Sequence, residues 1–142
     1  LLYKTNMPII VCSGLAFPKE KLSKVPKSLR KTIETQNINR FKTVLSAFPD
    51  IKLVFGHSGI YQYREVIELM KDNTNIYAEI STQPHQNIKT LIDEVGSERL
   101  LFGTDYPAFN HAITILSVLK ATENEIERIN IFSRNAKKIL NI

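Results

Sequence analysis

The chain has 142 residues, of which 43% are hydrophobic and 23% are charged. This length and composition fit one ordered globular domain and exclude a disordered chain. No apolar run approaches the roughly 20 residues that a membrane-spanning helix needs, and residues 1–6 lack the pattern of a signal peptide. A single cysteine, Cys12, excludes an internal disulfide framework. Together these features predict a cytoplasmic protein that has no membrane partner.

The net charge of +5 arises in one segment, residues 19–31. This segment has one acidic residue, Glu20, whereas the rest of the chain has equal numbers of basic and acidic residues. A solvated surface loop is one interpretation, and a basic loop that attracts an acidic small-molecule substrate is the other. No aromatic residues are interleaved with the basic ones, which argues against nucleic acid as a partner. The basic residues are Lys19, Lys21, Lys24, Lys27, Arg30 and Lys31.

Short apolar runs alternate with helical apolar patterns along the chain. The runs predict buried strands over residues 9–12, 51–55, 75–80 and 100–102. Apolar residues at helical spacing predict helices over residues 38–48, 63–70, 88–95 and 113–119. Further helical signals follow, beginning with a capping box at Thr122 and Glu125 and ending near residue 140. The predicted order is therefore β-α-β-α-β-α-β-α-α.

The spacing of the predicted strands limits the fold. The later strands begin about every 24 residues, which is typical of parallel βαβ units with right-handed crossovers. Such units build either a doubly wound sheet or a (β/α)8 barrel. Because an eight-unit barrel takes about 250 residues, four units in this chain would make half of one.

Residues that can carry chemistry stand at or just after the end of each predicted strand. They are Cys12, His57, either Glu79 or Ser81, and Asp105. Taken singly, each could be an ordinary structural residue. In a barrel, however, this end of the strands is where catalytic side chains converge on one axis. The repeated placement therefore favours the barrel.

Three of these strand ends resemble the amidohydrolase-related family of metal-dependent TIM-barrel enzymes. The segment FPDIKLVFGHSG (residues 48–59) is similar to the family's sixth strand, and NIYAEIS (75–81) is similar to its seventh. The segment RLLFGTDYP (99–107) resembles the eighth strand and is the most specific of the three. The closing Asn135-Ala136 resembles the family's C-terminal helix. The resemblance implies an α/β fold that is the C-terminal half, strands 5–8, of a TIM-type (β/α)8 barrel, with residues 1–142 as a single partial domain.

The resemblance also implies a divalent metal, with zinc as the expected ion. Asp105 matches the eighth-strand Asp, which binds the metal and takes the proton of the metal-bound water. His57 matches the sixth-strand His, which either ligates a metal or polarises the substrate and shuttles a proton. Cys12 stands in the place of a fifth-strand His ligand, where a thiolate would bind zinc and a buried thiol would bind nothing. Arg99 matches a structural position at the opposite end of the barrel.

Half a barrel has two consequences for partners. The family's first-strand His pair has no counterpart here, so the chain by itself is expected to be a poor metalloenzyme. The apolar residues expected to face the barrel interior would meet water, which favours either a missing N-terminal half or a homo-oligomer. These residues are Ile9, Val11, Leu53, Phe55 and Leu101.

Three functions follow from the resemblance and the residues. The first is a metal-dependent hydrolase in which a metal-activated water attacks an amide, lactone or ester carbonyl. The second is a non-oxidative decarboxylase of an acidic aromatic or muconate-like substrate, with the basic segment favouring carboxylates. The third is a non-catalytic half-barrel that serves as a binding module. Cys12 in the ligand place and the absent first half support the third.

Overall fold

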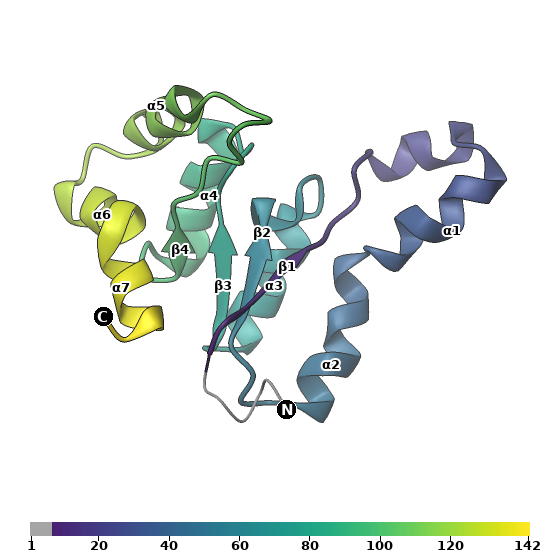
Figure 1. Cartoon of the computed structure of the whole chain (residues 1–142), viewed down its shortest axis with the longest axis horizontal. Coiled ribbons are helices and arrows are strands. Elements are labelled where there is room, and N and C mark those ends of the chain that lie inside the picture. Colours follow the sequence, from purple (N-terminus) through teal and green to yellow (C-terminus); the bar gives the residue numbers. More distant parts are fainter. Residues whose placement is uncertain (1–6) are drawn as a thin grey trace.

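The core of the molecule is a sheet of four parallel strands in the order β1-β2-β3-β4 (Figure 1). The structure is a computed structural model that describes residues 7–142, apart from the side chains of Lys19, Thr32, Glu34 and Thr35. Residues 1–6, where no signal peptide is expected, lie outside the described part. The parallel sheet and the intervening helices confirm the predicted α/β class. The strands are β1 (Ile9–Cys12), β2 (Leu53–Gly56), β3 (Ile76–Glu79) and β4 (Leu100–Leu101).

The helices follow the predicted alternation, with one exception. The basic segment is not the expected loop, because it forms a 3-10 helix, Lys19–Lys24, and α1, Lys27–Thr35. The apolar residues of this segment recur at a spacing that places them on one face of a helix. The many charged residues between them make this pattern hard to see in the sequence. The other helices are α2 (Phe41–Ala47), α3 (Tyr63–Asp72), α4 (His85–Val95), α5 (His111–Ala121), α6 (Glu125–Ile129) and α7 (Asn135–Leu140), with a π-helical turn at Asn130–Arg134. The predicted cap at Thr122 is wrong, because the Asn124 side chain caps α6. Among the described residues, no helix is long and apolar enough to cross a membrane.

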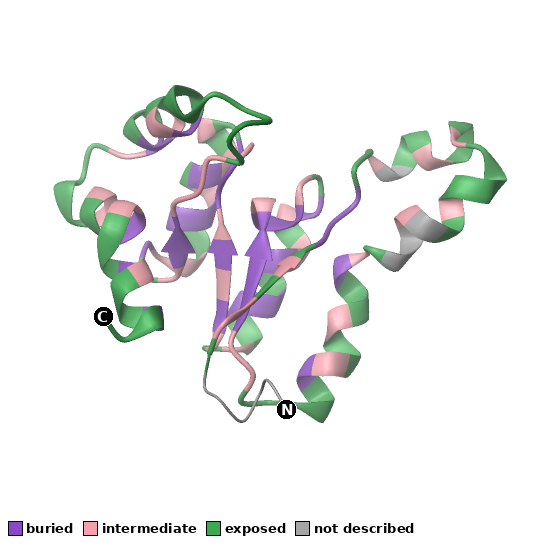
Figure 2. Cartoon of the chain, in the orientation of Figure 1, coloured by how far each residue is buried: buried purple, intermediate pink, exposed green. Residues whose placement is uncertain are grey.

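Helices α2, α3 and α4 cover one face of the sheet and bury the main core (Figures 1 and 2). Leu53 and Phe55 lie on this face and are 2% and 0% exposed. The prediction that they face a barrel interior is wrong, and it is wrong also for Ile9 and Val11, which pack against the same core. Leu101 lies instead in the separate cluster with Val54. In a parallel sheet both sides of a strand are apolar, so the sequence does not specify which set faces the helices. The opposite face carries Ile10 and Val54, which are neighbours in the register.

The two edges of the sheet differ. At β4, the Phe102 N–H donates a hydrogen bond to the Ile131 carbonyl (3.1 Å) in the π-helical turn, and Ile139 of α7 packs in a small cluster with Val54 and Leu101. At the β1 edge, Ile10 is 70% exposed. The C-terminal helices therefore cover part of the β4 side, whereas the side chain of Ile10 faces water.

Candidate functional site

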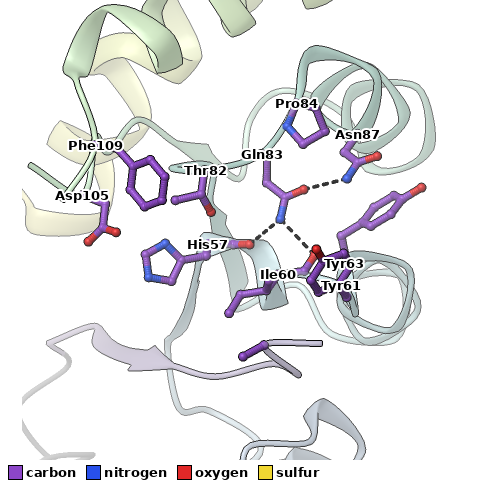
Figure 3. A pocket seen from close by; sticks show the side chains of 11 residues that line it. His57, Ile60, Tyr61, Tyr63, Thr82, Gln83, Pro84, Asn87, Asp105 and Phe109 are labelled. Atoms are coloured by element: carbon purple, nitrogen blue, oxygen red, sulfur yellow. Dashed lines mark hydrogen bonds between the residues drawn. The ribbon is translucent and has the colours of Figure 1, made fainter. Parts of the chain in front are cut away.

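A cavity of about 580 Å³ opens at the carboxyl ends of the strands (Figure 3). Segments that follow all four strands contribute to its wall. The lining residues are Ala16 after β1; His57, Ile60, Tyr61 and Tyr63 after β2; Thr82, Gln83, Pro84 and Asn87 after β3; and Asp105 and Phe109 after β4. The structure thus brings His57 and Asp105 to one cavity, as expected if both act on one substrate. Tyrosine, phenylalanine and isoleucine side chains form much of the remaining wall.

His57 directly follows β2 and is held by several hydrogen bonds, one of them from the Ile60 N–H to its carbonyl (2.8 Å). Its backbone N–H donates to Glu79 Oε2 (2.9 Å), and its Nδ1 lies 2.7 Å from Ser81 Oγ. Its carbonyl accepts a hydrogen bond from Gln83 Nε2 (2.6 Å). The His57 side chain is 18% exposed. The imidazole is therefore fixed in position while part of its surface reaches the cavity.

Glu79 and Ser81 both belong to this arrangement, whereas the sequence left open which of them matters. Glu79 Oε1 accepts the Ser81 N–H (2.6 Å), and Glu79 Oε2 accepts the Ser81 hydroxyl (2.8 Å). The neighbouring Ser58 hydroxyl donates to the Glu79 carbonyl (2.9 Å). Neither Glu79 nor Ser81 lines the cavity. They tie the end of β3 to the segment that carries His57.

Left-handed backbone conformations cluster around the cavity. His57, Thr82 and Asp105 have φ values of 54°, 62° and 55°, and each follows a different strand. Ile60, at φ 55°, also lines the cavity and is a β-branched residue, for which this conformation is a true outlier. Such residues cost about 1–3 kcal/mol each and concentrate at functional sites. Composition and periodicity contain no signal for this clustering, so the sequence alone could not show it.

The amide side chains of Gln83 and Asn87 are cavity residues that sequence reasoning missed. Gln83 Nε2 donates to the Ile60 carbonyl (3.1 Å) as well as to that of His57, and Asn87 Nδ2 donates to Gln83 Oε1 (2.8 Å) (Figure 3). Gln83 therefore spans the strained segment and holds it against the start of α4. Gln83 lies four residues after the end of β3, in a βα loop. Because such loops line the active sites of barrels, this position could have identified Gln83 from the sequence.

Asp105 lies in the loop after β4, and its side chain is exposed at the cavity wall. Its backbone carbonyl accepts the Phe109 N–H (3.2 Å). Among the described residues, no hydrogen bond or ion pair is formed by its carboxylate. Figure 3 shows the His57 ring on the side of the cavity where Asp105 lies. A carboxylate in this setting is available to bind a cation or accept a proton.

Cys12 ends β1 in register with Gly56, is exposed, and does not line the cavity. Within residues 7–142, no group of three or more His, Cys, Asp or Glu side chains is arranged to hold a metal ion. Catalytic zinc sites take three protein ligands. The donors of the described chain therefore do not make a complete metal centre by themselves.

Two further expectations concern basic residues. Arg99 is structural as expected, because its Nη1 donates to the Met70 and Asn73 carbonyls (2.7 and 2.8 Å) at the end of α3. Burial lowers the pKa of Arg99 from its ordinary value. No lysine or arginine in the described part of the chain lines the cavity. The basic segment instead forms an arm that leaves the sheet at the same end as the cavity (Figure 1).

Comparison with known proteins gives the family. The family model described as amidohydrolase matches residues 2–142. No curated protein matches the chain. Among solved structures, the 2,6-dihydroxybenzoate decarboxylase from Rhizobium is similar, with 16% identity and a TM-score of 0.71 over 99% of this chain and 53% of that one.

Two other solved structures share the fold. An uncharacterised TIM-barrel protein from Bordetella bronchiseptica has 22% identity and a TM-score of 0.71 over 99% of this chain and 49% of that one. A dihydroxybenzoic acid decarboxylase from a Polaromonas species, with bound manganese and the inhibitor 2-nitroresorcinol, has 16% identity and a TM-score of 0.69 over 99% and 51% of the two chains. The chain thus spans about half the length of these proteins. Since the family match covers almost all of its residues, the chain belongs to the amidohydrolase family.

Proposed function

We propose that the chain is the C-terminal half of a (β/α)8 barrel, with β1 to β4 as strands 5–8 and residues 1–142 as a single partial domain. The similarity of 99% of this chain to about half of the TIM-barrel protein from Bordetella supports this arrangement. The exposed Ile10 side chain lies on the face that would line the barrel. A second half of the barrel would cover the β1 side of this face, where Ile10 is exposed, since Val54 is already buried. We infer that this partner is either an N-terminal half or another copy of the chain in a homo-oligomer.

The function that the cavity supports best is hydrolysis of an amide, lactone or ester carbonyl. The observation that carries this proposal is the meeting of His57 and Asp105 at one cavity, each on a left-handed backbone after its strand. The Asp105 carboxylate would take the proton of the attacking water. His57 would act on the same reacting centre. The isoleucine, tyrosine and phenylalanine side chains of the wall would hold an apolar part of the substrate.

Asp105 and His57 are also the proposed metal ligands, with Cys12 as a further donor. Because the described donors do not complete a centre, the remaining ligands would come from the partner half. The family resemblance favours zinc, and the manganese in the Polaromonas enzyme makes manganese a second candidate for the ion. Such an ion supplies a Lewis acid that lowers the pKa of bound water.

Non-oxidative decarboxylation of an acidic aromatic or muconate-like substrate is the second candidate. The basic arm favours it, because the arm leaves the sheet at the end where the cavity opens. The absence of lysine and arginine from the described cavity wall favours the hydrolase. A non-catalytic binding module is the third candidate, and it requires no turnover at all.

Turnover by an Asp105→Asn variant separates these candidates. Asparagine tolerates the left-handed conformation of residue 105 as well as aspartate does, so the variant is expected to fold normally. The assay uses the assembled protein with added Zn²⁺ or Mn²⁺, and ester, lactone, anilide and hydroxybenzoate substrates. We expect ester, lactone or anilide hydrolysis to fall by about 100-fold or more in the variant. Asp50→Asn, an exposed change before β2, is the matched control and keeps wild-type turnover. Wild-type turnover in Asp105→Asn would refute the assigned role.

A further inference from the structure

We propose that Ser81 and Glu79 are positioning residues that hold neutral His57 as its Nδ1–H tautomer and leave the Nε2 lone pair free for the cavity. This inference deepens the proposed function, since it specifies how His57 meets a ligand or substrate. Only the functional consequence of the tautomer rests on the proposed function. The tautomer itself follows from hydrogen bonds within the chain.

The Ser81 hydroxyl determines the direction of the contact with His57. A serine hydroxyl has one proton to donate and lone pairs that accept. That proton goes to Glu79 Oε2, at 2.8 Å, because a carboxylate can only accept. Ser81 Oγ must then act as acceptor toward His57 Nδ1, 2.7 Å away. A neutral imidazole that donates from Nδ1 carries its lone pair on Nε2.

Hydrogen bonds also hold the Glu79 carboxylate in position, so the donor and acceptor in the His57–Ser81 hydrogen bond do not exchange. Oε1 accepts the Ser81 N–H (2.6 Å), and Oε2 accepts the His57 N–H (2.9 Å) in addition to the hydroxyl. Both oxygens therefore face donors, and rotation of the carboxylate would break backbone hydrogen bonds. His57 Nδ1 is 4.0 Å from Glu79 Oε2, beyond hydrogen-bond length. Ser81 is thus the link through which Glu79 acts on the ring.

Burial protects this link from water. Ser81 is 1% exposed, and the side chains of His57 and Glu79 are each 18% exposed. A water molecule would otherwise compete for Ser81 Oγ and allow either tautomer. Within the described residues, no hydrogen bond to Nε2 is present. Ser13 Oγ is the one buried polar side-chain atom without a partner in the described part of the chain, so the unpartnered Nε2 is accessible to solvent.

The tautomer narrows the roles that the sequence left open for His57, because it rules out donation from Nε2 by the neutral ring. With its lone pair at Nε2, neutral His57 accepts a proton or binds a metal ion. It cannot polarise a carbonyl group by donation from Nε2 until it has gained a proton. The neutral form of His57 is therefore an acceptor or ligand at Nε2, and Nε2 donates only in the protonated form.

Nitrogen-15 NMR of the imidazole tests this inference on the chain without any substrate. Spectra are recorded at about pH 9, where imidazoles are ordinarily neutral, on protein labelled at histidine. We expect wild-type His57 to show a protonated Nδ1 and a lone-pair Nε2. Ser81→Ala removes the acceptor for Nδ1–H, and we expect the ratio of the Nδ1–H to the Nε2–H form to fall about tenfold.

The matched control is Ser58→Ala. Ser58 is next to His57 and also binds Glu79, but only at its backbone carbonyl, so this variant keeps the wild-type tautomer. An Nε2–H tautomer in the wild type overturns the inference, as does an unchanged ratio in folded Ser81→Ala. If Ser81→Ala does not fold, the wild-type tautomer decides alone. Because no turnover is measured, failure here is distinct from failure of the Asp105→Asn test.

Discussion

Gly103 lies directly against the Glu79 carboxylate, so closely that a Cβ atom at position 103 would overlap Glu79 Oε1. Gly103 follows β4, and Glu79 ends β3, next to it in the sheet. The missing side chain at residue 103 is therefore what gives the Glu79 carboxylate its room. Through Glu79, this packing extends to the backbone N–H of His57.

Gly103→Ala is expected to lower the free energy of unfolding by about 1–3 kcal/mol, the usual cost of overpacking. Relief of the overlap also requires Glu79 to move, which weakens its hydrogen bond to the His57 N–H. Urea denaturation measures the first effect, and the amide shift of His57 measures the second. Gly56→Ala is the control, because its nearest contact would be the Val11 carbonyl oxygen at 3.3 Å. Equal stabilities of the two variants would contradict this account.

Arg99→Met tests the structural role of Arg99. The guanidinium donates to two carbonyls at the end of α3, and one of them belongs to Met70, which is fully buried. Loss of these charge-assisted bonds is expected to cost about 1.5–3 kcal/mol of unfolding free energy. Arg40→Met, at an exposed residue before α2, is expected to change stability by less than about 0.5 kcal/mol. A stability loss in Arg99→Met no larger than in this control would show that the carbonyls find other donors.

Reversal of charge on the basic arm tests whether an acidic substrate is attracted. Lys24 and Lys27 are exposed and lie away from the cavity wall. If the arm attracts a carboxylate substrate, the double variant Lys24→Glu/Lys27→Glu raises KM at low salt, and the difference from wild type shrinks as ionic strength rises. For a neutral ester or lactone we expect no change in KM at any salt concentration. The salt dependence of KM for acidic and for neutral substrates therefore separates a decarboxylase from a hydrolase.

Ile10→Glu tests the proposed interface of the half-barrel. Because Ile10 is 70% exposed, the change is expected to alter the unfolding free energy of the isolated chain by less than about 0.5 kcal/mol. A charge on the open face would nevertheless prevent burial against a partner half. Light scattering is expected to show a smaller mass for Ile10→Glu than for wild type. Ile142→Glu, at an exposed C-terminal residue, keeps the wild-type mass, and equal masses for all three proteins would exclude this face as the interface of a homo-oligomer.

Much of the fold was predictable from sequence, because strand runs and helical periodicity are local signals. The strands near residues 9, 53, 76 and 100 lie where apolar runs predicted them. The assignment of Leu53 and Phe55 to a face was not predictable, since both faces of these strands are apolar. The helical arm was missed because its charges outnumber its apolar residues.

The candidate site was predictable only at its strand ends. His57 and Asp105 were identified because each stands just after a predicted strand. The same criterion left two candidates, Glu79 and Ser81, at the third strand. Their actual relation, in which Ser81 links Glu79 to His57, depends on side-chain directions that spacing does not specify. The left-handed backbone at Ile60 is likewise a tertiary effect, since local sequence disfavours it.

Metal content by elemental analysis, measured together with mass by light scattering, tests whether this chain supplies an incomplete set of metal ligands that a partner half completes. We therefore expect the monomer to hold no stoichiometric zinc or manganese. We expect an assembled form to hold metal in stoichiometric amount and to lose it in Asp105→Asn. Stoichiometric metal in the monomer, or an Asp105→Asn assembly that keeps its metal, would contradict the account.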